Sequence, residues 1–224
     1  MMIRAVCYDA VGTLMHVTPS VAAVYAEVGS RFGSRRAVEE IGARFKVAFA
    51  RQEQLDAEAG WRTNETREMR RWRDIVAEVL GDAVDLDSCF AELYDRFRDP
   101  GVWQIDASAS SVLTAVRTRG VRQALASNFD QRLHELAQAL PPLRNLDPIV
   151  VSSDIGWRKP APAFFAHLLD LLQLPPSEVL FVGDDVVNDY IPAREAGMVS
   201  VLYDPQRKHP GLNRIERLDE IIRL

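Results

Sequence analysis

Outside residues 16–100, this sequence alternates between short apolar runs and longer amphipathic segments, and this alternation restricts its fold more than any other feature. The apolar runs are rich in β-branched residues, which is typical of buried strands. We expect strands at 3–8, 121–126, 148–151, 179–182 and 199–203. We expect helices near 110–117, from 130, at 162–172, at 189–195 and at the C-terminal end. The alternation predicts an α/β fold with a doubly wound, Rossmann-like parallel sheet, whose ligands lie beyond the carboxyl ends of the strands.

Residues 16–100 have a different pattern, because helical periodicity runs through them with hardly a strand signal. Helices are expected at about 18–33, 37–59, 64–80 and 87–98. Thr18 can cap the first helix, with Pro19 at its first position, and Asn64 can cap the third. This stretch is therefore predicted to be an inserted helical subdomain.

The length of the chain suits one α/β domain that carries one modest insertion. Its 224 residues, of which 47% are hydrophobic, can bury a sizeable core. We predict a core formed by residues 1–15 and 101–224, and a helical subdomain formed by residues 16–100. The dipeptide Pro100-Gly101 is the expected hinge between them.

Charge and composition exclude several classes of partner. The net charge is −5 and arginines are scattered, so the basic block that tracks a phosphate backbone is missing and we expect no nucleic-acid partner. Cys7 and Cys89 have no metal-binding spacing and are expected to be buried, reduced thiols. The segment before Asp9 is too short for a signal peptide, and no window reaches 18 apolar residues. We therefore expect a cytoplasmic protein without a membrane partner, in an oligomeric state that the sequence leaves open.

Four polar residues stand where the predicted strands end. Asp9, Ser127 and Asp184 each follow an apolar run, and Lys159 lies in the loop after the run at 148–151. Because the carboxyl ends of parallel strands share one edge of a sheet, these side chains are expected to meet on one rim.

The same positions carry a resemblance to a known family. The segments Asp9-Ala10-Val11-Gly12-Thr13-Leu14, Ala126-Ser127-Asn128, Lys159-Pro160 and Gly183-Asp184-Asp185-Val186-Val187-Asn188-Asp189 look like the four motifs of the haloacid dehalogenase-like hydrolase superfamily, in order and spacing. The stretch 16–100 resembles the small helical cap that this superfamily inserts after its first motif. Residues 103–130 further resemble the subgroup called haloacid dehalogenase-like hydrolase domain-containing protein 3. Each motif alone is weak evidence, but together they are specific.

The resemblance implies an enzyme that acts on a small phosphorylated substrate. Asp9 would attack phosphorus and form an aspartyl-phosphate, which divides one difficult displacement into two easier ones. Ser127 would donate a hydrogen bond and Lys159 would supply a positive charge to the phosphoryl group. Further substrate contacts are expected from Gly12, Thr13 and Asn128.

The resemblance also implies a Mg²⁺ cofactor, since an anionic nucleophile and an anionic substrate repel each other. The expected ligands are the side chains of Asp9 and Asp184 and the backbone carbonyl of Val11. Asp185 and Asp189 are expected to orient metal-bound water.

Val11 departs from the phosphatase pattern, which has an acid/base Asp two residues after the nucleophile. Loss of a general acid/base typically lowers the rate by about 10²- to 10⁴-fold while phosphate and metal binding survive. One hypothesis is therefore a Mg²⁺-dependent phosphatase that is slow or restricted to good leaving groups, and the alternative is a catalytically silent phosphate- or protein-binding member. Dehalogenases resemble a pattern with Tyr at this position and lack the acidic fourth motif. Schiff-base chemistry would need Lys46, which lies in an ordinary amphipathic helix pattern.

Simpler interpretations remain open for several residues. Asp9 and the pair Ser127-Asn128 could serve turns, Asp184-Asp185 could cap a helix, and Lys159 could be solvated. The basic stretch is more typical of a solvated helix face than of an anion site, and comprises Arg67, Arg70, Arg71 and Arg73. Trp61, Trp72 and Trp103 are expected to be packing anchors.

Overall fold

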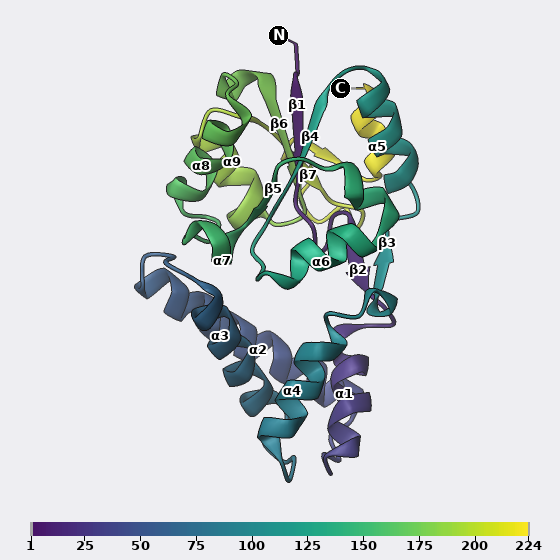
Figure 1. Ribbon diagram of the computed structural model, residues 1–224, viewed down its shortest axis with the longest axis vertical. Helices are drawn as coiled ribbons and strands as arrows, with labels where there is room; N and C mark the ends of the chain where they lie inside the picture. Colours follow the sequence, from purple (N-terminus) through teal and green to yellow (C-terminus); the bar gives the residue numbers. More distant parts are fainter. Residues whose placement is uncertain (1, 224) are drawn as a thin grey trace.

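The computed structural model describes residues 2–223 and has an α/β part above a helical part (Figure 1). In the described residues, a six-stranded sheet has the order β5-β4-β1-β6-β7-β8, and every pair of neighbours in it is parallel. Its strands are β1 (Ala5–Tyr8), β4 (Arg122–Ser127), β5 (Ile149–Val151), β6 (Val179–Gly183), β7 (Val199–Tyr203) and β8 (Arg214–Ile215). The predicted doubly wound α/β fold is confirmed.

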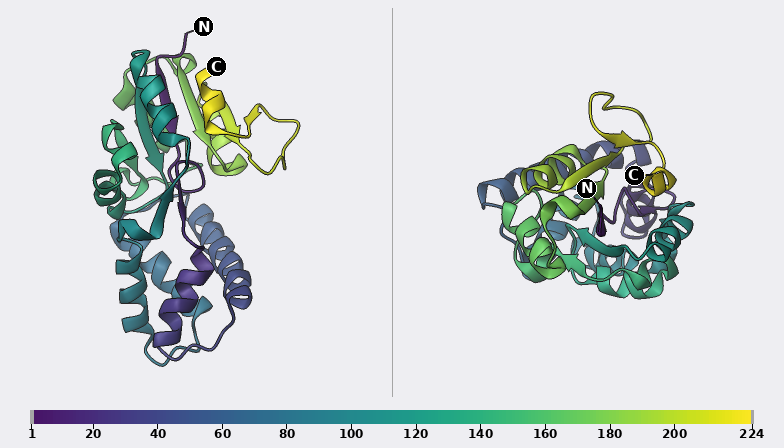
Figure 2. Two further views of the ribbon diagram at one scale, coloured as in Figure 1. Left: turned by 90° about the vertical axis from the view of Figure 1, so that its right-hand side faces the viewer. Right: turned by 90° about the horizontal axis from the view of Figure 1, so that it is seen from above.

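Helices cover both faces of this sheet, as the view from above shows (Figure 2). They are α5 (Ala109–Thr118), α6 (Arg132–Ala139), α7 (Ser152–Ile155), α8 (Pro162–Leu172) and α9 (Ile191–Glu195). Alternate residues of β1 point to opposite faces. Val6 and Tyr8 belong to the apolar cluster that includes residues of α5 and α6, and Ala5 and Cys7 belong to the cluster formed with α8 and α9. Burial on both faces explains why the β1 sequence is a continuous apolar run.

The helical part lies beyond the carboxyl ends of the strands, next to the end of the sheet where ligands are expected (Figure 1). It contains α1 (Val21–Arg31), α2 (Val38–Glu58), α3 (Glu65–Val79) and α4 (Leu86–Arg96). The side chain of Asn64 accepts a hydrogen bond from the amide of Arg67 and caps α3, as predicted. Among the described helices, none has both the length and the apolar character needed to cross a membrane.

A short antiparallel pair joins the two parts: β2 (Met15–Val17) pairs with β3 (Trp103–Ile105). β2 spans the predicted boundary at 15–16 and β3 begins just after the boundary at 100–101, so the two connections between the predicted core and the helical subdomain run side by side.

The predicted start of the first helix is wrong. Ser20, rather than Thr18, caps α1, and its hydroxyl accepts from the amide of Ala23 at 3.1 Å. Thr18 instead extends the β2–β3 ladder, because its amide donates to Val102 and its hydroxyl donates to Gln104. Pairing with the segment 102–104 therefore outweighs the local preference of Thr18 for a helix N-cap.

The C-terminal end also differs from the prediction of an amphipathic helix. It contains β8, which extends the sheet beside β7, and a 3-10 helix at Leu218–Arg223. The predicted helix at 189–195 is divided into a π-helical turn, Val186–Tyr190, and α9. Cys7 and Cys89 are buried and free, as expected.

Candidate active site

Asp9, Ser127 and Lys159 come together at the carboxyl edge of the sheet, although they are far apart in sequence. Asp9 follows β1, the central parallel strand, and Ser127 ends the neighbouring strand β4. The hydroxyl of Ser127 donates to Oδ1 of Asp9 at 3.2 Å, and Nζ of Lys159 donates to the same oxygen at 2.7 Å. Neither group donates to Oδ2 of Asp9, so this second oxygen is left for another partner.

Lys159 is almost completely buried among acceptors. Besides Asp9, its Nζ contacts Oδ1 of Asp189 at 2.5 Å and the carbonyl oxygen of Ala126 at 3.1 Å. Burial alone would lower the pKa of Lys159, but the attraction of Asp189 and Asp9 outweighs it and raises the pKa above its ordinary value. A solvated role for Lys159 is therefore excluded, and the residue carries a fixed positive charge.

Asn128 holds the loop that carries this lysine. Its side-chain amide donates to the carbonyl of Lys159 at 2.8 Å, and its side-chain oxygen accepts from the amide of Lys159 at 2.7 Å. Both ends of the Asn128 side chain are thus engaged with one backbone position. The contact fixes the place from which the Lys159 side chain enters the site.

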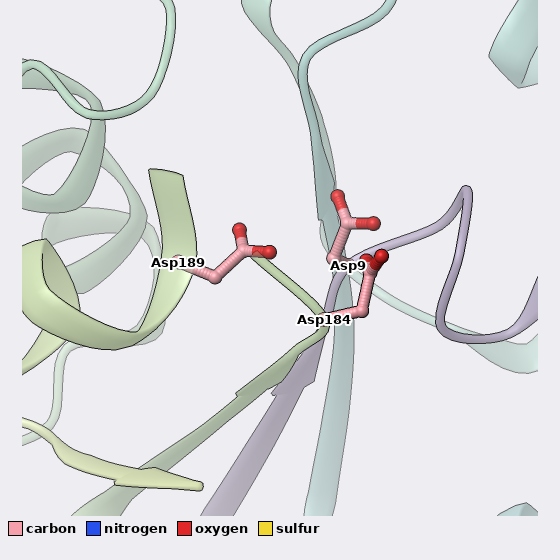
Figure 3. Close-up of side chains that lie close together, drawn as sticks. All are labelled: Asp9, Asp184 and Asp189. Atoms are coloured by element: carbon pink, nitrogen blue, oxygen red, sulfur yellow. The ribbon is translucent and has the colours of Figure 1, made fainter. Parts of the chain in front are cut away.

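Asp9, Asp184 and Asp189 form a carboxylate cluster, with one oxygen from each within 4.8 Å of the others (Figure 3). Asp184 lines a cavity, but the surrounding protein partly desolvates its carboxylate, and the charges of Asp9 and Asp189 repel it. These effects raise the pKa of Asp184 to about 7. Burial, opposed by Lys159 but reinforced by Asp9, likewise raises the pKa of Asp189 to about 7. The single positive charge of Lys159 can neutralise only one of these three carboxylates, which repel one another. The two remaining negative charges suit a divalent cation that prefers oxygen ligands.

Two glycines allow the backbone to approach these carboxylates. Gly12 has a φ of 98°, and a Cβ added there would lie 2.3 Å from a carboxylate oxygen of Asp184. At Gly183 an added Cβ would lie 2.3 Å from a carboxylate oxygen of Asp189. Larger residues at either position would displace an acid of the cluster. Gly12 therefore permits a close approach, in addition to its expected place beside the phosphoryl group.

Other predicted residues have local partners that the sequence did not reveal. Thr13 is fully buried, and its hydroxyl donates to Asp184 at 3.2 Å, so it orients this carboxylate. Asp185 caps the turn after β6 by accepting from the amides of Val187 and Asn188. The capping interpretation of the pair 184–185 thus applies to Asp185, whereas Asp184 faces Asp9. Asp189 belongs to the carboxylate cluster itself.

Val11 lies at the mouth of the site with 38% of its surface exposed, and it lines the same cavity as Asp9 and Asp184. Its backbone forms a bridge with Met15, which holds the loop after β1 close to β2. An apolar, accessible side chain therefore occupies the position where the phosphatase pattern has a carboxyl group.

A cavity of about 290 Å³ extends from these residues into the helical part. Its far wall is built mostly from aromatic side chains of α1, α2, α3 and α4, which are Tyr25, Phe45, Phe49, Trp72, Phe90 and Tyr94. Phe97, Trp103 and Phe129 complete this aromatic wall. Sequence reasoning missed the wall, because each ring occupies a position that also suits a helix packing face. The exposed Lys46 is not among the residues that line the cavity.

Arg158, also missed, joins the core to the helical part. Its guanidinium contacts Glu68 at 2.5 Å, and Glu53 and Asp56 at 3.4 Å each. Arg71 is fully buried in the same network, where it pairs with Glu53 and Asp56.

The solvated-face interpretation is therefore wrong for Arg71 and for Arg67, which pairs with Asp56 at 2.6 Å. It holds for the exposed Arg70 and Arg73. The cause of the difference is tertiary: the acidic partners lie on α2 and α3, and Arg158 reaches them from the core.

Comparisons with known proteins find relatives along most of the chain. A family model described as haloacid dehalogenase-like hydrolase matches residues 3–197. The chain is 29% identical over 230 aligned positions to haloacid dehalogenase-like hydrolase domain-containing protein 3 of Danio rerio, covering 98% of this chain and 95% of the relative.

Two solved structures share its fold. The HAD-hydrolase YfnB from Bacillus subtilis bound to magnesium superposes with a TM-score of 0.80 at 16% identity, covering 100% of this chain and 98% of YfnB. The L-2-haloacid dehalogenase from Xanthobacter autotrophicus with chloropropionic acid covalently bound gives 0.76 at 19% identity, with coverages of 100% and 98%. At these identities the two structures establish the architecture alone.

Proposed function

Because this chain belongs to the haloacid dehalogenase-like hydrolase family, we propose that it is a phosphatase-type hydrolase that transfers a phosphoryl group through Asp9. The observation that carries the proposal is the pairing of Oδ1 of Asp9 with Ser127 and Lys159, beside a cluster of carboxylates and open to a cavity. A carboxylate held in this way presents its other oxygen to a substrate.

The proposed reaction has two steps. Oδ2 of Asp9 forms a bond to phosphorus while the bond from phosphorus to the ester oxygen breaks, and the leaving group departs with the electron pair. Water then hydrolyses the aspartyl-phosphate, which releases inorganic phosphate and restores the Asp9 carboxylate. Lys159 and the hydroxyl of Ser127 donate hydrogen bonds to the charge that develops on the transferring group.

Asp9, Asp184 and the backbone carbonyl of Val11 are the proposed holders of a Mg²⁺ ion. The raised pKa values of Asp184 and Asp189 support this, because burial, together with repulsion from Asp9, disfavours their charged forms, and a bound cation would stabilise those forms. The buried side-chain oxygen of Asn188, which has no hydrogen-bond partner among the described residues, lines the same cavity and adds an oxygen donor. When bound, Mg²⁺ supplies positive charge that lowers the repulsion between the carboxylate and the phosphoryl oxygens. Asp185 and Asp189 would orient its water.

Val11 limits the proposed chemistry. A valine can neither protonate the leaving oxygen nor activate water, so the first step is restricted to esters whose leaving group is stable as an anion. The same observation supports a second candidate function, a phosphate-binding protein that does not turn over. The two differ in one measurable property, the Mg²⁺-dependent release of phosphate from an activated ester.

We expect wild-type protein with Mg²⁺ to cleave an aryl phosphate measurably and to leave an alkyl phosphate nearly untouched. Val11→Asp is expected to raise the rate on the alkyl phosphate by about tenfold or more, which is within the range of general acid catalysis. The exposed position of Val11 allows an ionised side chain there without burying an unpaired charge. Phosphate release from both esters measures the effect.

The blank for this experiment is Asp9→Asn, purified in the same way, because trace phosphatases would act equally in both preparations. Wild-type rates that match the blank on both esters, together with a folded Val11→Asp variant that gains nothing, would refute the phosphatase proposal in favour of phosphate binding. Removal of Mg²⁺ with a chelator is expected to return the wild-type rate to that of the blank.

A further inference from the structure

The cavity between the two parts of the molecule joins two chemically different ends. At one end lie Asp9, Ser127, Lys159 and Asp184, which form the proposed phosphoryl site. At the other end lies the aromatic wall contributed by α1–α4 and by the segments around Trp103 and Phe129. A molecule with its phosphoryl group at Asp9 therefore extends its leaving group toward the aromatic wall.

The rings of this wall retain exposed surface that faces the cavity. Phe45, Phe49, Trp72, Phe90 and Tyr94 are only partly buried although they line the interior. Several already meet one another at centroid distances of 5.4 to 6.4 Å, in edge-on, stacked and tilted arrangements. Aromatic groups favour such offset contacts with further rings, so the wall offers an aromatic guest more than apolar contact alone.

Charged side chains that border the cavity beyond the Asp9 end are engaged with one another. Arg132 forms hydrogen bonds with Asp130 and stacks on Tyr94, with its guanidinium carbon 3.7 Å from the ring centroid. Glu53 is held by Arg71 and Arg158. The charges of Arg132 and Glu53 are therefore already compensated by ion pairs, so this end favours an uncharged, apolar leaving group.

The volume of the cavity and the presence of valine at position 11 restrict the class of leaving group further. An engineered cavity of about 150 Å³ admits benzene, so a cavity of 290 Å³ that also includes the Asp9 end accommodates one aromatic ring together with its phosphoryl group. A phenol ionises near pH 10, as tyrosine does, which makes a phenolate a far better unprotonated leaving group than an alkoxide. Val11 requires such a leaving group and adds apolar surface where the ester oxygen would lie.

We propose that the substrate is a phosphate ester of a phenol, whose ring contacts the aromatic wall while its phosphoryl group lies at Asp9. This inference rests on the proposed phosphatase function and specifies its substrate class. In the reaction, the bond from phosphorus to the phenolic oxygen breaks, and the phenolate takes up a proton from water after it leaves.

The test measures binding rather than turnover, with phosphonates that contain no ester bond to hydrolyse. In the presence of Mg²⁺, calorimetry should give an affinity for phenylphosphonate about tenfold or more above that for methylphosphonate, since burying an aromatic ring supplies that difference. Inorganic phosphate is the reference ligand. Phenylphosphonate is also expected to bind more tightly than cyclohexylphosphonate, which has similar bulk but no π-system.

Trp72→Ala is expected to remove most of the preference for phenylphosphonate and to leave the affinity for inorganic phosphate unchanged. Met69→Ala is the matched control, because Met69 is exposed on the same helix and does not line the cavity. If Trp72→Ala does not fold, Phe49→Leu replaces it with a smaller change in the same wall and the same expected direction.

The outcomes separate this inference from the function on which it rests. Binding of phosphate without a preference for phenylphosphonate would overturn the aromatic assignment and leave the phosphoryl site standing. Tighter binding of cyclohexylphosphonate than of phenylphosphonate would also overturn it. No binding of phosphate or of any phosphonate would overturn both proposals together.

Discussion

Asp9→Asn is expected to lower the rate of aryl phosphate hydrolysis by about 10⁴-fold or more, the scale at which loss of a covalent nucleophile is felt. The amide has nearly the shape of the carboxylate, so Ser127 and Lys159 keep a partner of similar size. It cannot form the aspartyl-phosphate. The measurement is the steady-state rate with Mg²⁺, taken with the melting temperature of the same preparation.

Asp185→Asn is the matched control, because Asp185 lies beside the cluster and caps a turn by accepting hydrogen bonds, which asparagine also does. We expect this variant to lose no more than about tenfold in rate, the lower end of the 10- to 100-fold loss typical of residues that support a metal site, because asparagine keeps the capping hydrogen bonds. A residual rate in Asp9→Asn close to that of Asp185→Asn would mean that Asp9 contributes charge alone and that phosphoryl transfer uses another group.

Arg158→Met is expected to destabilise the protein by about 3 kcal/mol or more, because the loss of one partner from a buried ion pair leaves charge without compensation. The side chains of Arg158 and Glu68 are 4% and 1% exposed, and Asp56 is fully buried in the same network. Methionine fills a similar volume but cannot neutralise Glu68. Urea unfolding at neutral pH measures the loss.

A double-mutant cycle with Glu68→Gln tests the cause of this loss. If the unpaired carboxylate is responsible, the double variant should recover part of the stability that Arg158→Met loses. Arg70→Met, at an exposed position on α3, is the matched control and should change stability by less than about 0.5 kcal/mol. A loss in Arg158→Met no larger than in this control would show that the ion pairs of Arg158 with the helical part do not contribute to the stability of the protein.

The α/β fold and the convergence of Asp9, Ser127 and Asp184 could be predicted because both depend on local patterns. The strands β1 and β6 are buried throughout and are continuous apolar runs, and β4 is buried after its first residue. The residue at the end of each run has to lie at the carboxyl edge of the sheet. The loop that carries Lys159 comes after β5, an edge strand next to β4, and the short helix α7. The order of the strands in the sheet thus brings motifs that are distant in sequence to one edge, and no side-chain contact has to be known to predict this.

The aromatic wall and the Arg158 network could not be predicted in the same way. A Phe or Trp at helical spacing has the same pattern whether its ring packs in a core or borders a cavity, as at Phe49 and Trp72. Arg71 and Arg70 are adjacent in sequence, yet one is buried in ion pairs and the other is exposed. Only the packing of α2 against α3 separates their roles.

Asn128 and Thr13 show a similar limit. Their positions in the motifs predicted contacts with the substrate. In the structure, Asn128 bonds to the backbone of Lys159 and Thr13 donates to the carboxylate of Asp184. Such support of one site residue by another depends on side-chain geometry, which residue type and spacing do not specify.

The central claim is that phosphoryl transfer passes through Asp9 and that Val11 slows its completion. Because valine cannot activate water, the aspartyl-phosphate should accumulate when wild-type protein is mixed with an aryl phosphate and Mg²⁺. Rapid acid quenching and mass spectrometry of the peptide that contains Asp9 test this directly. The account predicts a phosphoryl group on Asp9 that needs Mg²⁺, is absent in Asp9→Asn and is less abundant in Val11→Asp. Turnover of the ester with Asp9 unmodified, or with the phosphoryl group on another residue, would contradict it.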